Sequence, residues 1–257
     1  MRTRNILAAL LLMMAGLQTA WAQKIVLIYK NGTTQKVPVS ELQDITFEKA
    51  DGTDVDEHEY VDLGLPSGTL WATCNIGAEN PWDYGDYFAW GETSGYNSGK
   101  TTFSWATYKY CNGSGTTLTK YCTNSTYGTI DNKRGLGAED DAATVNWGTD
   151  WQMPSILQFD ELINSSYTTT SWTTLGGVYG RMIVSKSNGN RVFLPAAGYR
   201  YDASLSNAGS SGGYWSRSLN SSDSRFGCNL HFFSSDIRMN YYDYRYSGRS
   251  VRPVRVQ

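Results

Sequence analysis

The side chains best suited to ligand recognition gather in residues 214–257, which contain seven arginines, nine aromatic residues and no lysine. Tyrosine offers a large contact area at low entropic cost, arginine offers forked hydrogen-bond donors, and small polar residues adapt to a partner. This chemistry favours the binding of a ligand over catalysis.

Residues 217–249 lack Lys, Glu, Gln and Trp, and they contain a single Met, Met239. Charged residues make up about a quarter of average protein sequence, so several Lys and Glu are expected in a stretch of this length. The missing types are those that codons ending in C or T cannot encode. The types present are those that arise when the first two letters of an AAC-type codon are randomised. The alternative is an ordinary strand region in which these residues are absent by chance.

Within this stretch, residues 228–233 and 236–240 alternate with the two-residue period of β-strands. Leu230, Phe232, Ile237 and Met239 are predicted to face the core, and the residues between them, including Asn229, to face outward. A solvated sheet face seldom carries so many aromatic residues without a partner, which indicates a binding surface. The predicted ligand-binding residues are Arg217, Asp223, Arg225, Phe226, Gly227, Cys228, His231, Phe233, Asp236, Arg238, Asn240, Tyr241, Tyr242, Asp243, Tyr244, Arg245 and Tyr246.

Catalytic and metal-binding patterns are weak by comparison. The chain has two histidines, of which His58 falls in an expected linker and His231 in the tail, so no catalytic residue, cofactor or metal ligand is predicted. Glu139, Asp140 and Asp141 could ligate calcium. The favoured interpretation is structural, with carboxylates accepting backbone N–H groups at a turn or helix start.

Tryptophan and cysteine each leave two interpretations open. The tryptophans could form a platform for stacking sugars, but in a glycine-rich chain they are more often core residues; they are Trp82, Trp90, Trp105, Trp147, Trp151 and Trp172. Four cysteines permit three disulfide pairings, and the closeness of Cys111 to Cys122 favours that pair over pairings with Cys74 or Cys228. The alternative is that all four thiols are free.

The N-terminus has the features of a secretory signal peptide over residues 1–22. Arg2 and Arg4 precede an apolar run over residues 6–14, and Ala20-Trp21-Ala22 predicts cleavage after Ala22. No other segment approaches the length of a membrane span. The mature protein is therefore expected to be secreted, or to lie at the cell surface or in the periplasm.

The elements that would position the tail fall into two parts. A small unit over residues 23–50 should contain strands 24–29 and 34–39 around an Asn31-Gly32 turn, a helical turn at 40–43 and extended residues at 45–47. An acidic linker is expected over 51–59. The main domain should run over 60–257, with its variable segment at 214–249.

Within the main domain, local signals predict a few regular elements. A short strand is expected at 69–72, long loops over 91–135, a helix over 155–165 capped by Ser155 and Gln158, and a hairpin of 180–185 with 191–194. High glycine content, 14% aromatic residues and only 18% charged residues favour an α+β fold with small sheets and one or two helices. The net charge of −2 favours neither nucleic acid nor an acidic membrane as a partner.

One family resemblance covers nearly all of residues 60–257. The opening segment YVDLGLPSGTLWATCNIG (60–77) is followed in order by EDDAA (139–143), WG (147–148), WQMP (151–154), FLPAAGY (193–199), GYWS (213–216) and SVRPVR (250–255). This arrangement resembles the Fibrobacter succinogenes major paralogous domain family of exported proteins of gut Bacteroidetes. The resemblance implies a C-type-lectin-like fold shared with formylglycine-generating enzymes, and a structural role for Arg252 and Arg255.

Some members of that family end in the variable region of a diversity-generating retroelement, and residues 214–249 resemble such a region. The resemblance implies a receptor or adhesin for a protein or glycan on a cell, phage or bacterial surface. A carbohydrate-binding or adhesin domain of fixed specificity is one alternative. A degenerate enzyme of the same fold is another, although the cysteine pair of formylglycine-generating enzymes is incomplete here, because only Cys228 lies in the relevant half.

Overall fold

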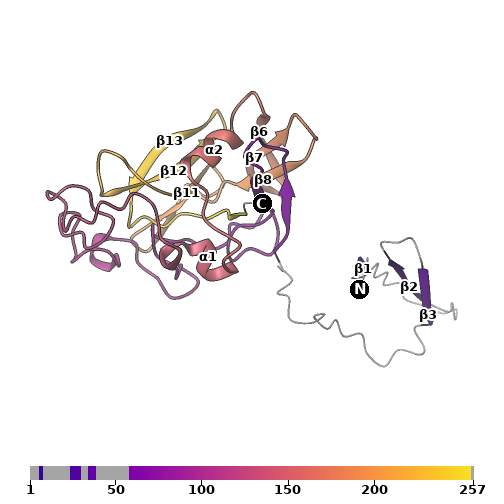
Figure 1. The fold of residues 1–257 in the computed structure, drawn as a ribbon, viewed down its shortest axis with the longest axis horizontal. Coiled ribbons are helices and arrows are strands. Elements are labelled where there is room, and N and C mark those ends of the chain that lie inside the picture. Colours follow the sequence, from indigo (N-terminus) through magenta and orange to yellow (C-terminus); the bar gives the residue numbers. More distant parts are fainter. Residues whose placement is uncertain (1–5, 8–23, 30–33, 39–57, 256–257) are drawn as a thin grey trace. The chain divides into compact units, whose positions relative to one another are not determined.

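The computed structural model describes residues 6–7, 24–29, 34–38 and 58–255, and its contacts divide the chain into Met1–Val55 and Asp56–Gln257 (Figure 1). In the first unit, three antiparallel strands follow the order β1-β2-β3; they are β1 (Ile6–Leu7), β2 (Lys24–Tyr29) and β3 (Thr34–Pro38). The predicted pairing of the strands at 24–29 and 34–39 is confirmed, with Ile28 opposite Thr34. The predicted cleavage site after Ala22, the elements at 40–47 and the linker over 51–57 lie outside the described residues.

The second unit combines short helices with small antiparallel sheets, so the predicted α+β class is confirmed. Its helical elements are η2 (Trp105–Thr107), η3 (Ala138–Asp140), α1 (Ala142–Trp147) and α2 (Ile156–Leu162). Its strands are β4 (Tyr60–Asp62), β5 (Leu70–Ala72), β6 (Thr168–Leu175), β7 (Val178–Ser185), β8 (Arg191–Pro195), β9 (Tyr199–Tyr201), β10 (Ser204–Ser206), β11 (Ser211–Leu219), β12 (Phe226–Phe233), β13 (Asp236–Tyr244) and β14 (Val254–Arg255). Within the described part of the chain, no helix has the length and apolar character needed to cross a bilayer.

The sheet β14-β5-β4 joins the two ends of this unit. Val254 of β14 lies opposite Trp71 of β5, and Val61 of β4 lies opposite Trp71 from the other side. The predicted strand at 69–72 is thus the centre of a three-stranded sheet. His58, expected in the linker, stacks on Trp147 with ring centroids 3.7 Å apart, so the last linker residues belong to this unit.

Arg252 fixes this closure from inside the protein. Its guanidinium is fully buried and donates to Asn75 Oδ1 (2.8 Å), to the carbonyls of Ala72 (3.0 Å) and Thr73 (2.6 Å), and to the carbonyl of Phe193 (3.0 Å). Four acceptors for one buried cation account for its burial, because an unpaired charge would be costly there. The structural role implied for Arg252 is confirmed.

The strongest local signals predict the correct elements. Ser155 caps α2 by accepting from the Gln158 N–H (3.2 Å), and the Gln158 side chain accepts from the Ser155 N–H (2.9 Å), which completes the predicted capping box. Phe159 and Leu162 are fully buried on the core face of this helix. The helix ends at Leu162, earlier than predicted, where its carbonyl accepts from the Thr168 hydroxyl (2.7 Å).

The hairpin β7–β8 is also confirmed, with Met182 opposite Phe193. Its turn contains Gly189 at φ +76°, a conformation that glycine adopts without a steric penalty. By contrast, the single helix-like element described in residues 91–135 is η2, and the rest consists of loops held by isolated bridges such as Cys111 with Leu118. The prediction of long loops in this region is confirmed.

The tail forms the sheet β11-β12-β13, in which β12 is the central strand (Figure 1). Leu230 and Phe232 of β12 are fully buried, Met239 of β13 is 3% exposed, and Ile237 packs at the edge of the same core cluster. The inward set predicted from the alternation is therefore confirmed. The helix α2 contacts this sheet and covers part of one of its faces.

Candidate ligand-binding surface

A row of aromatic rings, hereafter the aromatic ladder, runs over one end of the β12–β13 pair. Phe226 and Tyr244 are cross-strand partners whose rings stack at 4.6 Å. The Tyr242 ring meets Phe226 edge-on at 5.3 Å, and Tyr246 stacks on Tyr244 at 5.4 Å. Tyr242 is 54% exposed and Phe226 and Tyr244 are half-buried, so the ladder ends at solvent.

The loop region supplies further rings to this surface. Trp105 packs edge-on against Tyr244 (5.7 Å) and Tyr246 (4.9 Å), and Tyr201 of β9 meets Tyr246 at 5.5 Å. Trp105 is half-buried, and Tyr201 is 48% exposed. The surface is thus assembled from three separate parts of the chain. Tyr201 was missed in the sequence because nothing in its local pattern distinguishes it from other strand residues.

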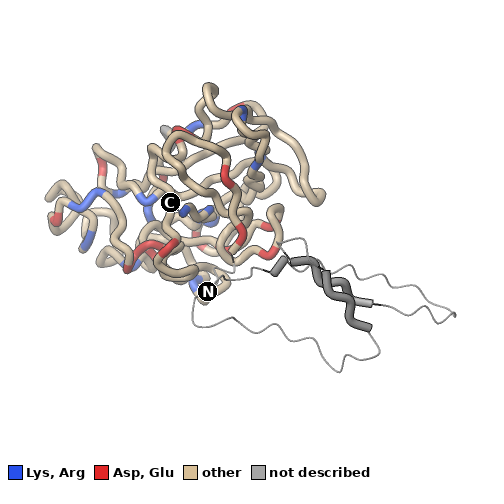
Figure 2. Tube along the Cα trace, turned by 45° about the vertical axis from the view of Figure 1, so that its right-hand side comes forward, with Lys and Arg blue, Asp and Glu red and all other residues tan. Residues whose placement is uncertain are grey.

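Charged groups flank the ladder as an internally neutral pair. The Arg225 guanidinium donates to Asp223 through Nε (3.1 Å) and Nη2 (2.7 Å), and it lies 4.5 Å from the centroid of the Tyr127 ring. Burial alone would raise the pKa of Asp223, but hydrogen bonds from Arg225 outweigh that effect and hold the pKa below its usual value. Acidic and basic residues are also interspersed over the second unit (Figure 2). Tyr127, from the glycine-rich loops, is the other contributor that sequence reasoning missed.

The tip of the same hairpin presents a second, smaller group. Arg238 and Asp236 form an ion pair of 2.5 Å, and the Arg238 guanidinium lies 5.8 Å from the Phe233 ring. Both charged side chains are more than two-fifths exposed. The strand β12 has eight residues from Phe226 to Phe233, so its two ends lie about 23 Å apart along the strand. The predicted outward residues therefore form two surfaces at opposite ends of the hairpin.

The middle of the hairpin is buried, which contradicts the prediction for Asn229 and His231. Asn229 is fully buried and His231 is 8% exposed. The reason is that the second face of this sheet is covered by the C-terminal segment: Arg249 lies over Gly213, the cross-strand partner of His231, and pairs with Asp243. Burial, with the nearby Arg249 and Arg238 charges, lowers the pKa of His231 to about 4. An alternating pattern cannot show that both faces of a central strand are covered.

Arg245 was also predicted to face outward and is instead fully buried. It donates to the Tyr108 hydroxyl (2.8 Å) and to the carbonyls of Tyr121 (3.1 Å), Ser224 (3.0 Å) and Lys120 (3.0 Å). Its guanidinium therefore ties the long loop to the tail beneath the aromatic ladder. Arg245 positions the surface and does not belong to it.

Three other predicted binding residues belong to the interior. A side chain on Gly227 would place its Cβ 2.7 Å from the Trp90 ring, Cys228 is 9% exposed, and Tyr246 is 4% exposed. Burial raises the pKa of the Cys228 thiol to about 11. These predictions were wrong because residue type alone does not distinguish a contact surface from a polar or aromatic core.

Arg217 points away from the ladder. It donates to Gln152 Oε1 and to the Leu136 carbonyl (2.8 Å), at a cavity beside α1. The predicted residues that do lie at the two surfaces are Asp223, Arg225, Phe226, Phe233, Asp236, Arg238, Tyr242 and Tyr244. The side chains of Asn240 and Tyr241 lie outside the described part of the structure.

The disulfide prediction was wrong, since all four cysteines are free. The Cys111 thiol donates to the Trp105 carbonyl (3.1 Å), and the Cys122 thiol donates to the Asn124 carbonyl (3.1 Å). Each thiol thus donates to a nearby carbonyl of its own loop and forms no cross-link between the two segments.

The acidic segment has the structural role favoured for it. Asp141 caps α1 by accepting from the N–H groups of Ala143 (3.0 Å) and Thr144 (3.1 Å), and it also accepts from the Met153 N–H (2.9 Å). Asp140 accepts from the Tyr121 hydroxyl (2.6 Å). The carboxylates are therefore engaged with protein donors.

The tryptophans do not share one exposed platform. Trp90 and Trp151 are fully buried, in line with the core interpretation. Trp105, Trp147 and Trp172 pack at the margins of the two core clusters, and Trp82 is half-buried over Gly176. Of these six described tryptophans, Trp105 alone adjoins the candidate surface.

Comparisons with known proteins returned no match from protein-family models, from curated proteins or from solved structures. The aromatic ladder and its framework are therefore interpreted from their geometry.

Proposed function

We propose that this protein is an exported, C-type-lectin-like receptor or adhesin whose C-terminal strands present a diversified binding surface. The observation that carries the proposal is the aromatic ladder, whose exposed end lies within the stretch that lacks Lys, Glu, Gln and Trp. Aromatic side chains and arginine dominate the binding energy of protein interfaces, and an exposed aromatic cluster normally has a partner.

The division between exposed and buried residues supports a variable surface on a constant framework. Phe226 and Tyr242 lie outside the two core clusters and can change without removing core contacts, whereas Arg245 and Gly227 are restricted by hydrogen bonding and by packing. Under this proposal, natural copies of the gene vary at the first set and retain the second.

A protein partner is favoured over a glycan by the orientation of the rings. Tyr244 stacks between Phe226 and Tyr246, so both of its faces are covered by other rings. Tyr244 therefore lacks a free face on which a sugar could stack. The exposed end combines the Tyr242 ring with the Arg225–Asp223 pair, which suits the mixed apolar and polar surface of a protein.

The alternatives receive less support from the geometry. A fixed carbohydrate site on the tryptophans would need exposed rings, but Trp90 and Trp151 are buried. A thiol-dependent enzyme would need a reactive thiolate, whereas burial raises the pKa of Cys228 to about 11 and so keeps its thiol protonated at neutral pH.

The diversification is tested by sequencing the gene and its flanking DNA. The expected result is a near-repeat of the segment encoding residues 217–249, differing only at adenines of the repeat, beside a reverse-transcriptase gene. Codons in the tail that end in all four bases, with no repeat nearby, would contradict the proposal of a diversified surface.

Binding is tested with labelled protein on a panel of intact bacterial cells and on a glycan array. We expect binding to cells that protease treatment abolishes, loss of binding in Tyr242→Ala and Phe226→Ala, and normal binding in Trp82→Ala. Binding to the array that is lost in Trp82→Ala and kept in the two tail variants would instead support a fixed carbohydrate-binding domain.

A further inference from the structure

The strand β6 forms one outer edge of the sheet β6-β7-β8 (Figure 1). It pairs with β7 along all eight of its residues, from Thr168 to Leu175, without a register shift. Among the described residues, no backbone hydrogen bond from outside the sheet reaches residues 169–175. A strand edge of this kind presents a row of N–H and C=O groups on which another strand can pair.

The tight turn between β6 and β7 determines which backbone groups of β6 face outward. Its two residues, Gly176 and Gly177, have φ values of +56° and +81°, and Leu175 lies directly opposite Val178. In a two-residue turn of this kind the closing pair is hydrogen-bonded, and hydrogen-bonded pairs then recur at every second residue. The residues between them direct their N–H and C=O groups away from β7. These outward-facing residues are Thr170, Trp172 and Thr174.

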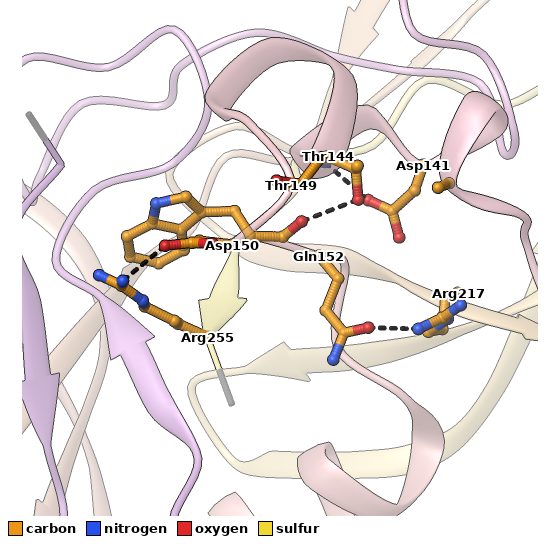
Figure 3. Close-up of a pocket in the computed structure, with 9 residues that line it drawn as sticks. Asp141, Thr144, Thr149, Asp150, Gln152, Arg217 and Arg255 are labelled. Atoms are coloured by element: carbon orange, nitrogen blue, oxygen red, sulfur yellow. Dashed lines mark hydrogen bonds and ion pairs between the residues drawn. The ribbon is translucent and has the colours of Figure 1, made fainter. Parts of the chain in front are cut away.

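Other edge strands of this unit contain features that oppose pairing with a foreign strand. The strand β13 carries Asp236, Arg238 and Asp243, and its pairing with β12 includes a register shift. The strand β8 contains an arginine and a proline. The strand β14 has two residues, and its Arg255 pairs with Asp150 at 2.6 Å (Figure 3). By contrast, β6 has the sequence TTTSWTTL, with no charged residue, proline or glycine, so nothing in the strand itself blocks its edge.

The edge of β6 is complementary to itself. In antiparallel pairing about a two-fold axis at Trp172, Thr170 lies opposite Thr174 of the partner subunit, and the two Trp172 residues lie opposite each other. These pairs exchange backbone hydrogen bonds, because they consist of the outward-facing residues. Between them, Ser171 lies opposite Thr173 of the partner subunit. Hydroxyl pairs and aromatic pairs are favourable cross-strand neighbours, and this register brings no like charges together.

We propose that the protein forms a two-fold symmetric dimer in which the β6 strands of two copies pair, giving one continuous six-stranded sheet. Two-fold dimers are the commonest oligomers, and each copy contributes the same surface to them. Arg181 of β7 donates to the carbonyls of Phe233 (2.8 Å) and Ser234 (3.2 Å), so this sheet adjoins the tip of the tail hairpin. The aromatic ladder lies at the other end of β12 and takes no part in the contact. The dimer therefore does not depend on the function of the ladder.

The first test is sedimentation of the mature protein over a range of concentrations. We expect a reversible monomer–dimer equilibrium with a Kd of about 10 μM, because a contact along one strand is smaller than a standard protein interface. A monomer at every concentration up to about 200 μM, twentyfold above that Kd, would overturn the proposal.

Two matched double variants test the contact and its register. Thr170→Lys with Thr174→Glu places opposite charges across the two-fold axis and should keep the dimer. Thr170→Lys with Thr174→Lys places like charges there and should weaken the Kd by about tenfold or more. Ser204→Lys, on the exposed strand β10, is the control for an added charge and should leave the Kd unchanged. Equal dimerisation of the two double variants would refute the pairing of β6 with itself.

Hydrogen exchange of the unmodified protein provides a measurement that needs no substitution. The amides of Thr170, Trp172 and Thr174 should exchange more slowly as the concentration rises through the Kd, because the pairing satisfies their N–H groups. Unchanged exchange at these three amides while the dimer forms would show that the dimer uses another surface and would overturn the proposal.

Discussion

Two neighbouring arginines at the open end of the tail hairpin have opposite roles: the Arg245 N–H donates to the Arg225 carbonyl (3.0 Å), but their side chains differ in burial. The Arg225 side chain pairs with Asp223 beside the rings of the aromatic ladder. The Arg245 side chain is enclosed and donates to four oxygens of the surrounding chain. Arginine and tyrosine therefore build both the surface and its foundation, and burial rather than residue type separates the two.

The largest expected effect on stability is at the buried Arg245. Replacing Arg245 with methionine should lower the free energy of unfolding by about 4 kcal/mol, because the carbonyls of Lys120, Tyr121 and Ser224 would lose a buried donor. Urea denaturation followed by tryptophan fluorescence measures this loss. A loss below about 1 kcal/mol would break the distinction between surface and foundation.

The buried histidine should add a pH dependence to stability. His231 has a pKa of about 4 in the folded protein, below its value of 6.5 in an unfolded chain, so the unfolded chain binds the proton first as the pH falls. The contribution of neutral His231 to the free energy of unfolding is fully present above pH 6.5. It declines as the pH falls toward 4, and below pH 4 it changes no further. The decline should total about 3 kcal/mol.

The measurement is thermal unfolding of the wild type and of His231→Gln between pH 7.5 and pH 4. Protonation of carboxylates with lowered pKa values, such as Asp131 and Asp223, reduces the stability of the folded protein mainly at lower pH. This contribution is common to both proteins. Parallel pH curves for the two proteins would show that His231 titrates as an exposed side chain does.

A smaller loss of stability is expected at Gly227, which packs directly against core side chains. Gly227→Ala should cost about 2 kcal/mol, because its Cβ would meet the Trp90 ring at 2.7 Å and the Trp215 ring at 3.1 Å. Gly135→Ala is the matched control, since the nearest atom to its Cβ, the Arg217 carbonyl oxygen, is 3.8 Å away. Chemical denaturation of both variants tests this, and equal stabilities would mean that residue 227 is as free to vary as the surface.

The smallest effects on stability are expected at the exposed end. Arg225→Ala and Tyr242→Ala should each change the free energy of unfolding by less than about 1 kcal/mol, because a solvent-accessible ion pair and an exposed ring contribute little. The same denaturation assay measures both variants. A larger loss in either would mean that the ladder stabilises the fold as well as presenting a surface.

Short-range features of this fold could be predicted from the sequence, and long-range ones could not. The capping box of α2 and the turn of β7–β8 each depend on residues within a few positions of one another. The burial of Asn229 depends instead on β12 being central and on a covering segment twenty residues later, which includes Arg249. A two-residue alternation identifies the faces of a strand but does not reveal what covers the second face.

The candidate site shows the same limit. Phe226, Tyr242 and Tyr244 were predicted because the tail has an unusual composition, a property visible without any structure. Trp105 was assigned to a different platform, and Tyr127 and Tyr201 were missed, because they reach the surface through loops and a separate strand pair. The pairing of Cys111 with Cys122 failed for a related reason: closeness in sequence does not determine where thiols point.

The covered centre of β12 has a practical meaning for anyone building a binder library on this scaffold. Randomising every tail position would fill the library with chains that cannot pack Asn229, His231 or Arg245, and the usable fraction would shrink with each such codon. Restricting the mutagenesis to Phe226, Tyr242 and the Arg225–Asp223 pair confines the variation to side chains that reach solvent and lie outside the core clusters. The yield of folded binders from such a library therefore depends on whether the randomised codons fall at solvent-facing or at buried positions of each strand.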